Sequence, residues 1–173
     1  MASIRGRDTE PERLLRSALF ARGFRYRINS ADLPGKPDLK LSKHRAVVFV
    51  NGCFWHGHDC RYFRRPTSNQ AFWDEKIRKN RERDLRNVRD LRTEGWRVCI
   101  VWECLIRSIA FSERRSELID LIGEWIEGDA PFLEVFGAKS TQNTKIRYAD
   151  LGKNEDDRVF AAEREGRYEG SRR

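Results

Sequence analysis

The chain has 173 residues and carries 35 Lys and Arg against 27 Asp and Glu, so its formal net charge at pH 7 is +8. Ten Phe and five Trp supply enough bulky apolar side chains for a core, which excludes a chain that is disordered throughout. No uninterrupted apolar run is longer than five residues, far fewer than the roughly 20 that a membrane helix needs. The composition therefore predicts a folded, basic protein whose natural partner is a polyanion.

The N-terminus contains no apolar stretch of the kind that marks a secretory signal. Four cysteines without such a signal indicate a reducing compartment, where a thiol is expected to bind metal or be buried rather than form a disulfide. We therefore expect a cytoplasmic protein with no membrane association.

The predicted secondary structure follows from periodicity and from the residues that begin and end each element. Thr9 and Glu12 have the spacing of a capping box, and Gly23 is a natural end for the helix that follows. The apolar run Ala46–Val50 is typical of a central strand that is buried on both faces. The predicted elements, in chain order, are a helix from Thr9 to Gly23, strands at Phe24–Ile28, Asp38–Leu41 and Arg45–Val50, a helix at Gln70–Glu94, a strand at Trp96–Glu103 and a helix at Ser112–Glu127.

This order predicts an α/β fold in which helices flank a central mixed sheet, all within one domain at residues 1–137. The inner face of the long charged helix is predicted to consist of Phe72, Trp73, Ile77, Leu85, Val88 and Leu91. Residues 138–173 are charged and contain only scattered apolar side chains, so we expect them to form a flexible C-terminal tail.

Cysteine and histidine residues gather in the turn after the central strand. Four possible ligands lie within eight residues there, and a fifth, Cys104, ends a later strand. Tetrahedral structural zinc requires four thiolate or imidazole ligands, and one such set is Cys53, His58, Cys60 and Cys104.

One histidine of this turn is left over by a four-ligand site. If His58 binds the metal, His56 is free to act as an acid or base near neutral pH, but the spacing is equally compatible with the reverse choice. Burial as small apolar side chains is the alternative for all the cysteines, and it is the expected role of Cys99 in the middle of a strand.

Carboxylates suggest a second metal site. Asp38 follows Pro37 at the start of a strand, and Pro-Asp at such a position recurs in the metal sites of nucleases. Phosphodiester hydrolysis uses hard oxygen ligands to hold Mg²⁺, and the backbone carbonyl of Val50 could be another such ligand. Turn chemistry is the alternative for Asp38, and the capping box alone accounts for Glu12.

Residues 61–97 contain twelve Lys and Arg against six acidic residues. Such a segment either binds DNA phosphates or forms a solvated helix face. The aromatic pairs Phe54–Trp55 and Phe72–Trp73 could insert between base pairs of a duplex. Core packing is the competing interpretation, which we expect to hold for Phe72 but not for Trp55.

These motifs resemble those of the bacterial very-short-patch repair (Vsr) endonucleases. The resemblance extends over residues 8–128, and its most specific part is the run from Gly52 to His56. It implies a restriction-endonuclease-like fold. It also implies an enzyme that nicks one DNA strand 5′ of the thymine in a T:G mismatch, the lesion left when 5-methylcytosine deaminates.

The resemblance implies roles for individual residues. Asp38 and the Val50 carbonyl would bind catalytic Mg²⁺, His56 would be the catalytic histidine, and Glu12 would order metal-bound water. Asn51 belongs to the active site at a position where the family commonly has a second histidine. The implied ligands of structural Zn²⁺ are Cys53, His58, Cys60 and Cys104. The implied DNA-binding residues are Phe54, Trp55, Trp73 and Lys36.

We therefore expect a Mg²⁺-dependent nicking endonuclease with a structural Zn²⁺, acting as a monomer on mismatched double-stranded DNA. It would work in the bacterial cytoplasm at the nucleoid, in company with mismatch-repair proteins. Two alternatives are a restriction or defence endonuclease with a different target on the same fold, and a non-catalytic, zinc-dependent DNA-binding module. The segment before Glu12 is shorter than the DNA-gripping arm usual in the family.

Overall fold

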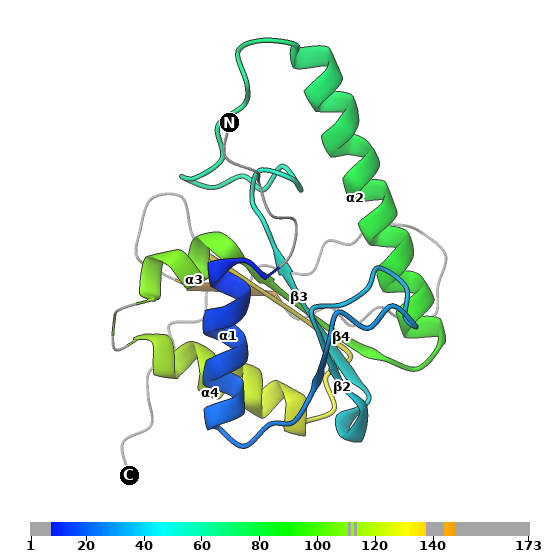
Figure 1. The fold of residues 1–173 in the computed structure, drawn as a ribbon, viewed down its shortest axis with the longest axis vertical. Helices are drawn as coiled ribbons and strands as arrows, with labels where there is room; N and C mark the ends of the chain where they lie inside the picture. The colour runs from blue at the N-terminus through cyan, green and yellow to red at the C-terminus, as the bar shows by residue number, and fades with distance from the viewer. Residues whose placement is uncertain (1–7, 111, 113, 138–143, 148–173) are drawn as a thin grey trace.

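A computed structural model describes residues 8–110, 112, 114–137 and 144–147 of the chain (Figure 1). The helices are α1 (Glu10–Ala21), α2 (Gln70–Thr93), α3 (Glu103–Ile109) and α4 (Arg114–Glu127). The strands are β1 (Arg27–Ile28), β2 (Leu39–Leu41), β3 (Ala46–Asn51), β4 (Arg97–Trp102), β5 (Phe132–Gly137) and β6 (Thr144–Arg147). Among these residues, no helix combines the length and apolar character needed to cross a membrane.

The strands form one mixed sheet in which their spatial order follows the chain, from β1 to β6. Strands β3, β4 and β5 are parallel, whereas β1 and β2 on one side and β6 on the other pair antiparallel with their neighbours. Strand β3 lies inside the sheet, and its residues Ala46, Val47 and Val48 are completely buried. The predicted α/β class, with a mixed sheet and a central, doubly buried strand, is confirmed.

Helices cover both faces of the sheet. Helices α1, α3 and α4 pack on one face, where Leu19, Leu39, Ile122 and Leu133 belong to the larger core. Helix α2 lies on the other face, over a smaller core that includes Leu91. Figure 1 shows this separation and also shows that the N-terminal half of α2 extends beyond the sheet.

Helix α1 begins after Thr9 as predicted, but its capping box has a different geometry. The Thr9 hydroxyl donates to the Glu12 carboxylate at 2.8 Å, and that carboxylate accepts the backbone N–H of Asp8 at 2.9 Å. The Glu12 side chain therefore receives hydrogen bonds from the segment that enters the helix. At the other end, Gly23 has φ +94°, a left-handed conformation that favours glycine after a helix.

The predicted inner face of α2 is only partly correct. Ile77 and Leu91 are buried, but Phe72 is 59% exposed and Leu85 is 46% exposed. Phe72 lies at the N-terminal end of α2, which extends past the sheet, so no sheet surface is available to cover it. The expectation that Phe72 packs in the core is therefore wrong.

Several element boundaries also differ from the prediction. The first strand is reduced to Arg27–Ile28, and the strand expected from Asp38 begins at Leu39. Helix α3 and strand β5 were not predicted: α3 begins directly at the end of β4, and β5 follows only a short loop after α4. Within the predicted tail, β6 pairs with β5, and the other tail residues lie outside the described part.

The contrast between two leucines of α2 tests this packing. Leu91→Ala should lower the free energy of unfolding by about 2–5 kcal/mol, because Leu91 is completely buried and its truncation leaves a cavity. Leu85→Ala, on the same helix, should cost less than about 1 kcal/mol because Leu85 is largely exposed. Urea unfolding of both variants measures the difference, and equal losses would contradict the orientation of α2.

Candidate active site and metal-binding cluster

A cavity of about 510 Å³ lies between the loop that precedes β2, the end of β3 and one face of α2. The sequence-predicted residues that line it are Lys36, Asp38, Val50, Asn51 and His56. The aspartate and the histidine predicted to act together therefore face one common space, although they lie in different segments of the chain. Residues of α2 complete the wall, among them Arg83, Asp84 and Asn87.

Asp38 is held at the edge of the cavity by the sheet. Its carboxylate accepts the backbone N–H of Val50, at 2.7 Å, in the neighbouring strand β3. Burial raises the pKa of Asp38 from 3.8 to about 6, and the negative charge of Glu12 adds to this effect. The Val50 N–H and the Arg16 guanidinium act in the opposite direction. A desolvated carboxylate with a raised pKa is typical of a functional site rather than of a turn.

Glu12 and Arg16 form a buried ion pair beside Asp38. Glu12 is 5% exposed and Arg16 is 9% exposed, and the guanidinium lies 2.8 Å from the Glu12 carboxylate. The same guanidinium contacts Asp8, also at 2.8 Å. Capping alone does not require burial, so the capping box does not account for the full environment of Glu12.

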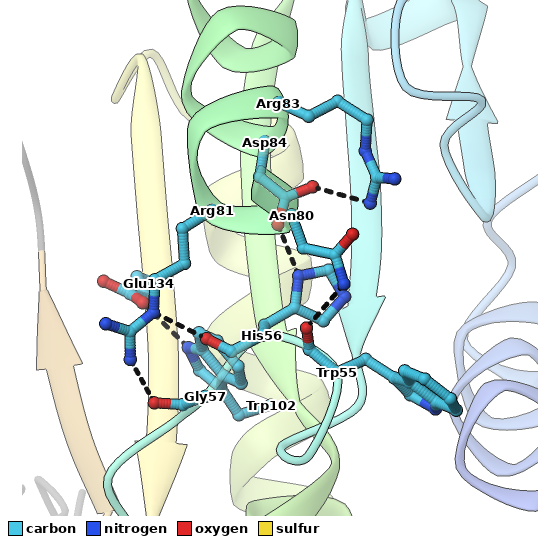
Figure 2. A network of polar contacts seen from close by, with 9 residues as sticks. All are labelled: Trp55, His56, Gly57, Asn80, Arg81, Arg83, Asp84, Trp102 and Glu134. Carbon is cyan, nitrogen blue, oxygen red and sulfur yellow. Dashed lines mark hydrogen bonds and ion pairs between the residues drawn. The ribbon is translucent and has the colours of Figure 1, made fainter. Parts of the chain in front are cut away.

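The turn that carries His56 is bound along its backbone by one turn of α2, as Figure 2 shows. The Asn80 amide donates to the Trp55 carbonyl at 2.8 Å, and the Arg81 guanidinium donates to the His56 carbonyl at 2.9 Å and to the Gly57 carbonyl. These bonds fix three consecutive peptide groups relative to the helix.

The imidazole of His56 is itself oriented by α2, because its Nδ1 atom pairs with the carboxylate of Asp84 (Figure 2). The sequence motifs predict no individual role for Asp84, Asn80 or Arg81. The available signal was the i, i+4 spacing of Asn80 and Asp84, which places both on one face of a helix.

Gly57, the residue after His56, allows this close approach. It has φ +59°, and a Cβ atom there would lie 2.5 Å from Ile77 and 2.9 Å from Arg81. Any larger residue would therefore push the turn away from α2.

The four residues of the first predicted ligand set come together behind this turn. The ligand atoms of Cys53, His58, Cys60 and Cys104 all lie within 4.8 Å of one another. His58 Nδ1 is 3.5 Å from the sulfur of Cys53 and 3.6 Å from that of Cys104. This geometry separates the two histidines, which spacing could not do: His58 joins the sulfurs and His56 faces the cavity. The cluster can hold a metal ion.

The thiols of this cluster are already polarised. A hydrogen bond with Cys53, together with contact to His58, lowers the pKa of Cys104, and the same bond raises the pKa of Cys53. Metal binding needs thiolates, and the contact with His58 favours the charged form of Cys104. Cys99 lies apart in the middle of β4 and is completely buried, and burial raises its pKa, as expected for a structural thiol.

The ring of His58 is supported from behind by Trp102. The two rings stack with their centroids 4.1 Å apart, and the Trp102 indole N–H donates to Glu134 at 2.7 Å. This chain of contacts, from the β5 carboxylate through the indole, restricts the orientation of the His58 imidazole.

The aromatic residues proposed to contact DNA form one cluster on the outside of the turn. The ring centroids of Phe54 lie 5.2 Å from those of both Trp55 and Trp73, and Phe72 lies 5.3 Å from Trp73. The Lys76 ammonium lies over three of these rings. The rings pack against one another and not in the two sheet cores, and Phe72 is exposed.

Comparison with known proteins places this site in a family. A family model described as "DNA mismatch endonuclease Vsr" matches residues 1–62. The DNA mismatch endonuclease Vsr of Escherichia coli K12 is 42% identical over 137 residues, which cover 78% of this chain and 86% of that protein. The type II nicking enzyme V.NmeAIP of Neisseria meningitidis serogroup A is 48% identical over 115 residues, covering 66% and 82%. V.XorIIP of Xanthomonas oryzae is 44% identical over 115 residues, covering 66% and 85%.

The cavity, the cysteine–histidine cluster that can hold a metal ion and these relatives together define the protein as a DNA endonuclease. More specifically, the chain belongs to the Vsr family of nicking endonucleases, as the resemblance of its motifs predicted.

The desolvated charge of Asp38 gives a test that does not depend on catalysis. A folded-state pKa above 3.8 means that the native state binds more protons between pH 3.8 and about 6, so Asp38 makes stability fall as pH rises through this window. Asp38→Asn should therefore raise the free energy of unfolding at pH 7.5 by about 1–3 kcal/mol, because the amide still accepts the Val50 N–H without a buried charge. Below pH 4 the gain should vanish.

Urea unfolding at both pH values, without added divalent cations, measures this gain. Asp32→Asn is the matched control, since Asp32 is an exposed carboxylate paired with Lys40, and its replacement should give no stabilisation at pH 7.5. A destabilised Asp38→Asn variant at pH 7.5 would contradict the inferred cost of burying this carboxylate.

Proposed function

We propose that this protein is a Mg²⁺-dependent endonuclease that nicks one DNA strand 5′ of the thymine in a T:G mismatch, leaving a 5′-phosphate and a 3′-hydroxyl. The observation that carries the proposal is the convergence of Asp38 and the Asp84-bound His56 on one open cavity. The name of the Escherichia coli relative, a DNA mismatch endonuclease, supports mismatched DNA as the substrate.

His56 is proposed as the general base. With Nδ1 bound to the Asp84 carboxylate, the proton sits on Nδ1 and the lone pair of Nε2 is available to take a proton from water. The carboxylate also compensates the positive charge that the imidazole gains in this step. The side chains of Asn80 and Arg81, which donate to backbone carbonyls of the turn, hold the imidazole in place so that Nε2 can face the attacking water.

Asp38 and the backbone carbonyl of Val50 are proposed to hold Mg²⁺. Oxygen ligands of this kind suit a hard cation, and when bound the ion would stabilise negative charge on the phosphate and on the leaving 3′ oxygen. Glu12, fixed by Arg16, is proposed to orient water near this site. The Asn51 amide, which lines the cavity, would donate or accept hydrogen bonds there without changing charge.

Structural zinc is proposed at Cys53, His58, Cys60 and Cys104. Three sulfurs and one imidazole nitrogen form a usual zinc donor set, and Cys104 lies on another element than the turn. Joining the turn to α3 through this set would hold His56, Phe54 and Trp55 together as one rigid unit.

The surface aromatics Phe54, Trp55 and Trp73 are proposed to insert into the duplex beside the mismatch, with Lys36 contacting its backbone. Partial exposure and mutual packing of these rings, near but outside the cavity, support this role.

The mixed sheet with the site at one edge supports the restriction-endonuclease-like fold. We also propose a monomer with a catalytic domain at residues 1–137, to which strand β6 of the segment 138–173 adds through its pairing with β5. It would work at the bacterial nucleoid beside mismatch-repair proteins.

A second candidate is a Vsr-like nickase or restriction-associated endonuclease with a different target. The names of the relatives from Neisseria meningitidis and Xanthomonas oryzae, which are type II nicking enzymes, favour it, as does Asn51 at a position where the family commonly has histidine. A purely non-catalytic DNA-binding module is disfavoured, because it would need neither the Asp84–His56 pair nor a buried, charged Asp38.

The zinc proposal predicts a metal content that depends on particular cysteines. Purified protein should contain about one equivalent of zinc, and Cys104→Ser should lower this content and destabilise the fold, since a structural site contributes to folding. Cys99→Ser, at the buried thiol outside the cluster, should retain the zinc. Elemental analysis of the three proteins checks this, and a metal-free wild type that remains fully folded would contradict it.

A nicking assay tests the catalytic proposal. T:G and matched duplexes labelled on each strand are incubated in Mg²⁺ with wild type, Asp38→Ala, His56→Ala and Asp84→Asn. Wild type should nick only the thymine strand of the T:G duplex, whereas Asp38→Ala and His56→Ala should show no detectable nicking. Asp84→Asn should be slower by roughly 10²–10⁴-fold, because the orientation of the imidazole is lost.

The pattern of cleavage separates the candidates. Cleavage of matched DNA at a defined sequence would favour the alternative target, and undiminished nicking by Asp38→Ala would exclude the proposed Mg²⁺ site.

A further inference from the structure

We infer that Arg83, together with Lys36, binds the DNA phosphate that enters the cavity, with the Arg83 guanidinium gripping its non-bridging oxygens. This inference rests on the proposed function, because it assigns the group that receives the substrate's charge in the same site. It adds no chemical step to the hydrolysis.

The first observation is where the charges of the cavity lie. Its lining contains two carboxylates, Asp38 and Asp84, and two cations, Arg83 from α2 and Lys36 from the loop before β2. The two cations come from separate segments of the chain, so each reaches the common space independently. A phosphodiester carries one negative charge, which this pair of cations can receive beside His56.

The second observation is how loosely Arg83 is held. Its side chain is 55% exposed, and its contact with the Asp84 carboxylate is 3.4 Å long, compared with about 2.7–2.9 Å for a strong charge-assisted hydrogen bond. By contrast, Arg81 on the same helix is engaged by two carbonyls of the turn. A guanidinium has five N–H donors in a planar fork, which matches two phosphate oxygens and leaves one edge for Asp84.

Asp84 connects this guanidinium to the proposed base. One of its carboxylate oxygens pairs with His56 and the other lies near Arg83, as Figure 2 shows. A phosphate bound by Arg83 is thereby positioned relative to the imidazole through a single, shared side chain. Holding the attacking water and the phosphate in a fixed relative geometry lowers the barrier to hydrolysis.

The third observation is the backbone conformation of Lys36. It has φ +52°, in the left-handed region that is unfavourable for residues other than glycine, and it follows Gly35 at φ +72°. The loop is pressed against α2 at this point, since a Cβ on Gly35 would lie 2.8 Å from the Asn87 amide. Strained residues of this kind gather at functional sites, and here the strained residue is a lysine that lines the cavity together with Arg83.

Neutral phosphates test the inference directly. Mismatched duplexes are prepared in which one linkage at a time around the nick site is a methylphosphonate, which removes the charge of that phosphate. Equilibrium binding is measured without divalent cations for wild type, Arg83→Met, Arg83→Lys and Arg78→Met. Arg78 is the matched control. It lies on the same helix, but it forms ion pairs with Glu75 and Glu82 and does not line the cavity.

On unmodified DNA, Arg83→Met should weaken binding by about tenfold. The slope of the logarithm of the binding constant against the logarithm of the salt concentration should become shallower by about 1, as expected for the loss of one phosphate contact. Arg83→Lys, which keeps the charge but not the fork, should lose less affinity. On one methylphosphonate duplex the loss caused by Arg83→Met should shrink to less than about twofold, because the contacted charge is already gone. Arg78→Met should change binding little and equally on all duplexes.

An equal loss for Arg83→Met on every duplex would overturn the inference, since it would show only a general electrostatic effect. Unchanged binding of Arg83→Met to unmodified DNA would overturn it as well. Failure of the proposed function looks different: wild type itself would then fail to nick T:G duplexes in Mg²⁺, whatever the behaviour of Arg83. Unfolding curves of Arg83→Met and Arg83→Lys establish that both variants are folded.

Discussion

The attachment of the His56 turn to helix α2 is the contact on which the rest of the site depends. The turn contains no strand or helix of its own, so its peptide groups need other partners. Asn80 and Arg81 bind three successive carbonyls and Asp84 binds the imidazole, all within little more than one helical turn. A helix that is anchored to the sheet near its C-terminal end thus positions a loop near its middle, and with it the proposed base.

The topology of the sheet explains why the two candidate sites, the cavity and the cysteine–histidine cluster, lie side by side. Strands β3 and β4 are parallel neighbours, with Asn51 opposite Trp102, so the turn after β3 and the helix after β4 start at the same edge. Cys104 thereby meets the other cysteines. The antiparallel β2 begins at this edge, which places Asp38 beside Val50. Parallel strands commonly place sites at their carboxyl ends, and an antiparallel partner adds a residue from its start.

Several residues of the candidate site lower the stability of the folded state, and their arrangement is better explained by function. Asp38 is desolvated, Glu12 and Arg16 are buried as ions, and Lys36 has a left-handed backbone. Each of these features opposes folding, and the two apolar cores on the faces of the sheet offset them. A buried carboxylate that is charged at neutral pH lacks the full hydration of an exposed aspartate, and a bound cation would compensate its charge.

Local signals in the sequence determined the start of helix α1, the buried strand β3, the grouping of cysteines and histidines and the choice of Asp38 as a candidate, because each depends on neighbouring residues and on spacing. The preference for His56 over His58 came from the family resemblance, since spacing left both histidines open. The exposed side of α2 was misjudged at Phe72, since periodicity describes a helix face and not where the sheet beneath it ends. The tertiary structure gave the two histidines separate surroundings, and it alone paired His56 with Asp84, 28 residues away. Such pairings depend on how helices, strands and loops pack in space. The order of residue types along the chain does not show which distant residues will be in contact.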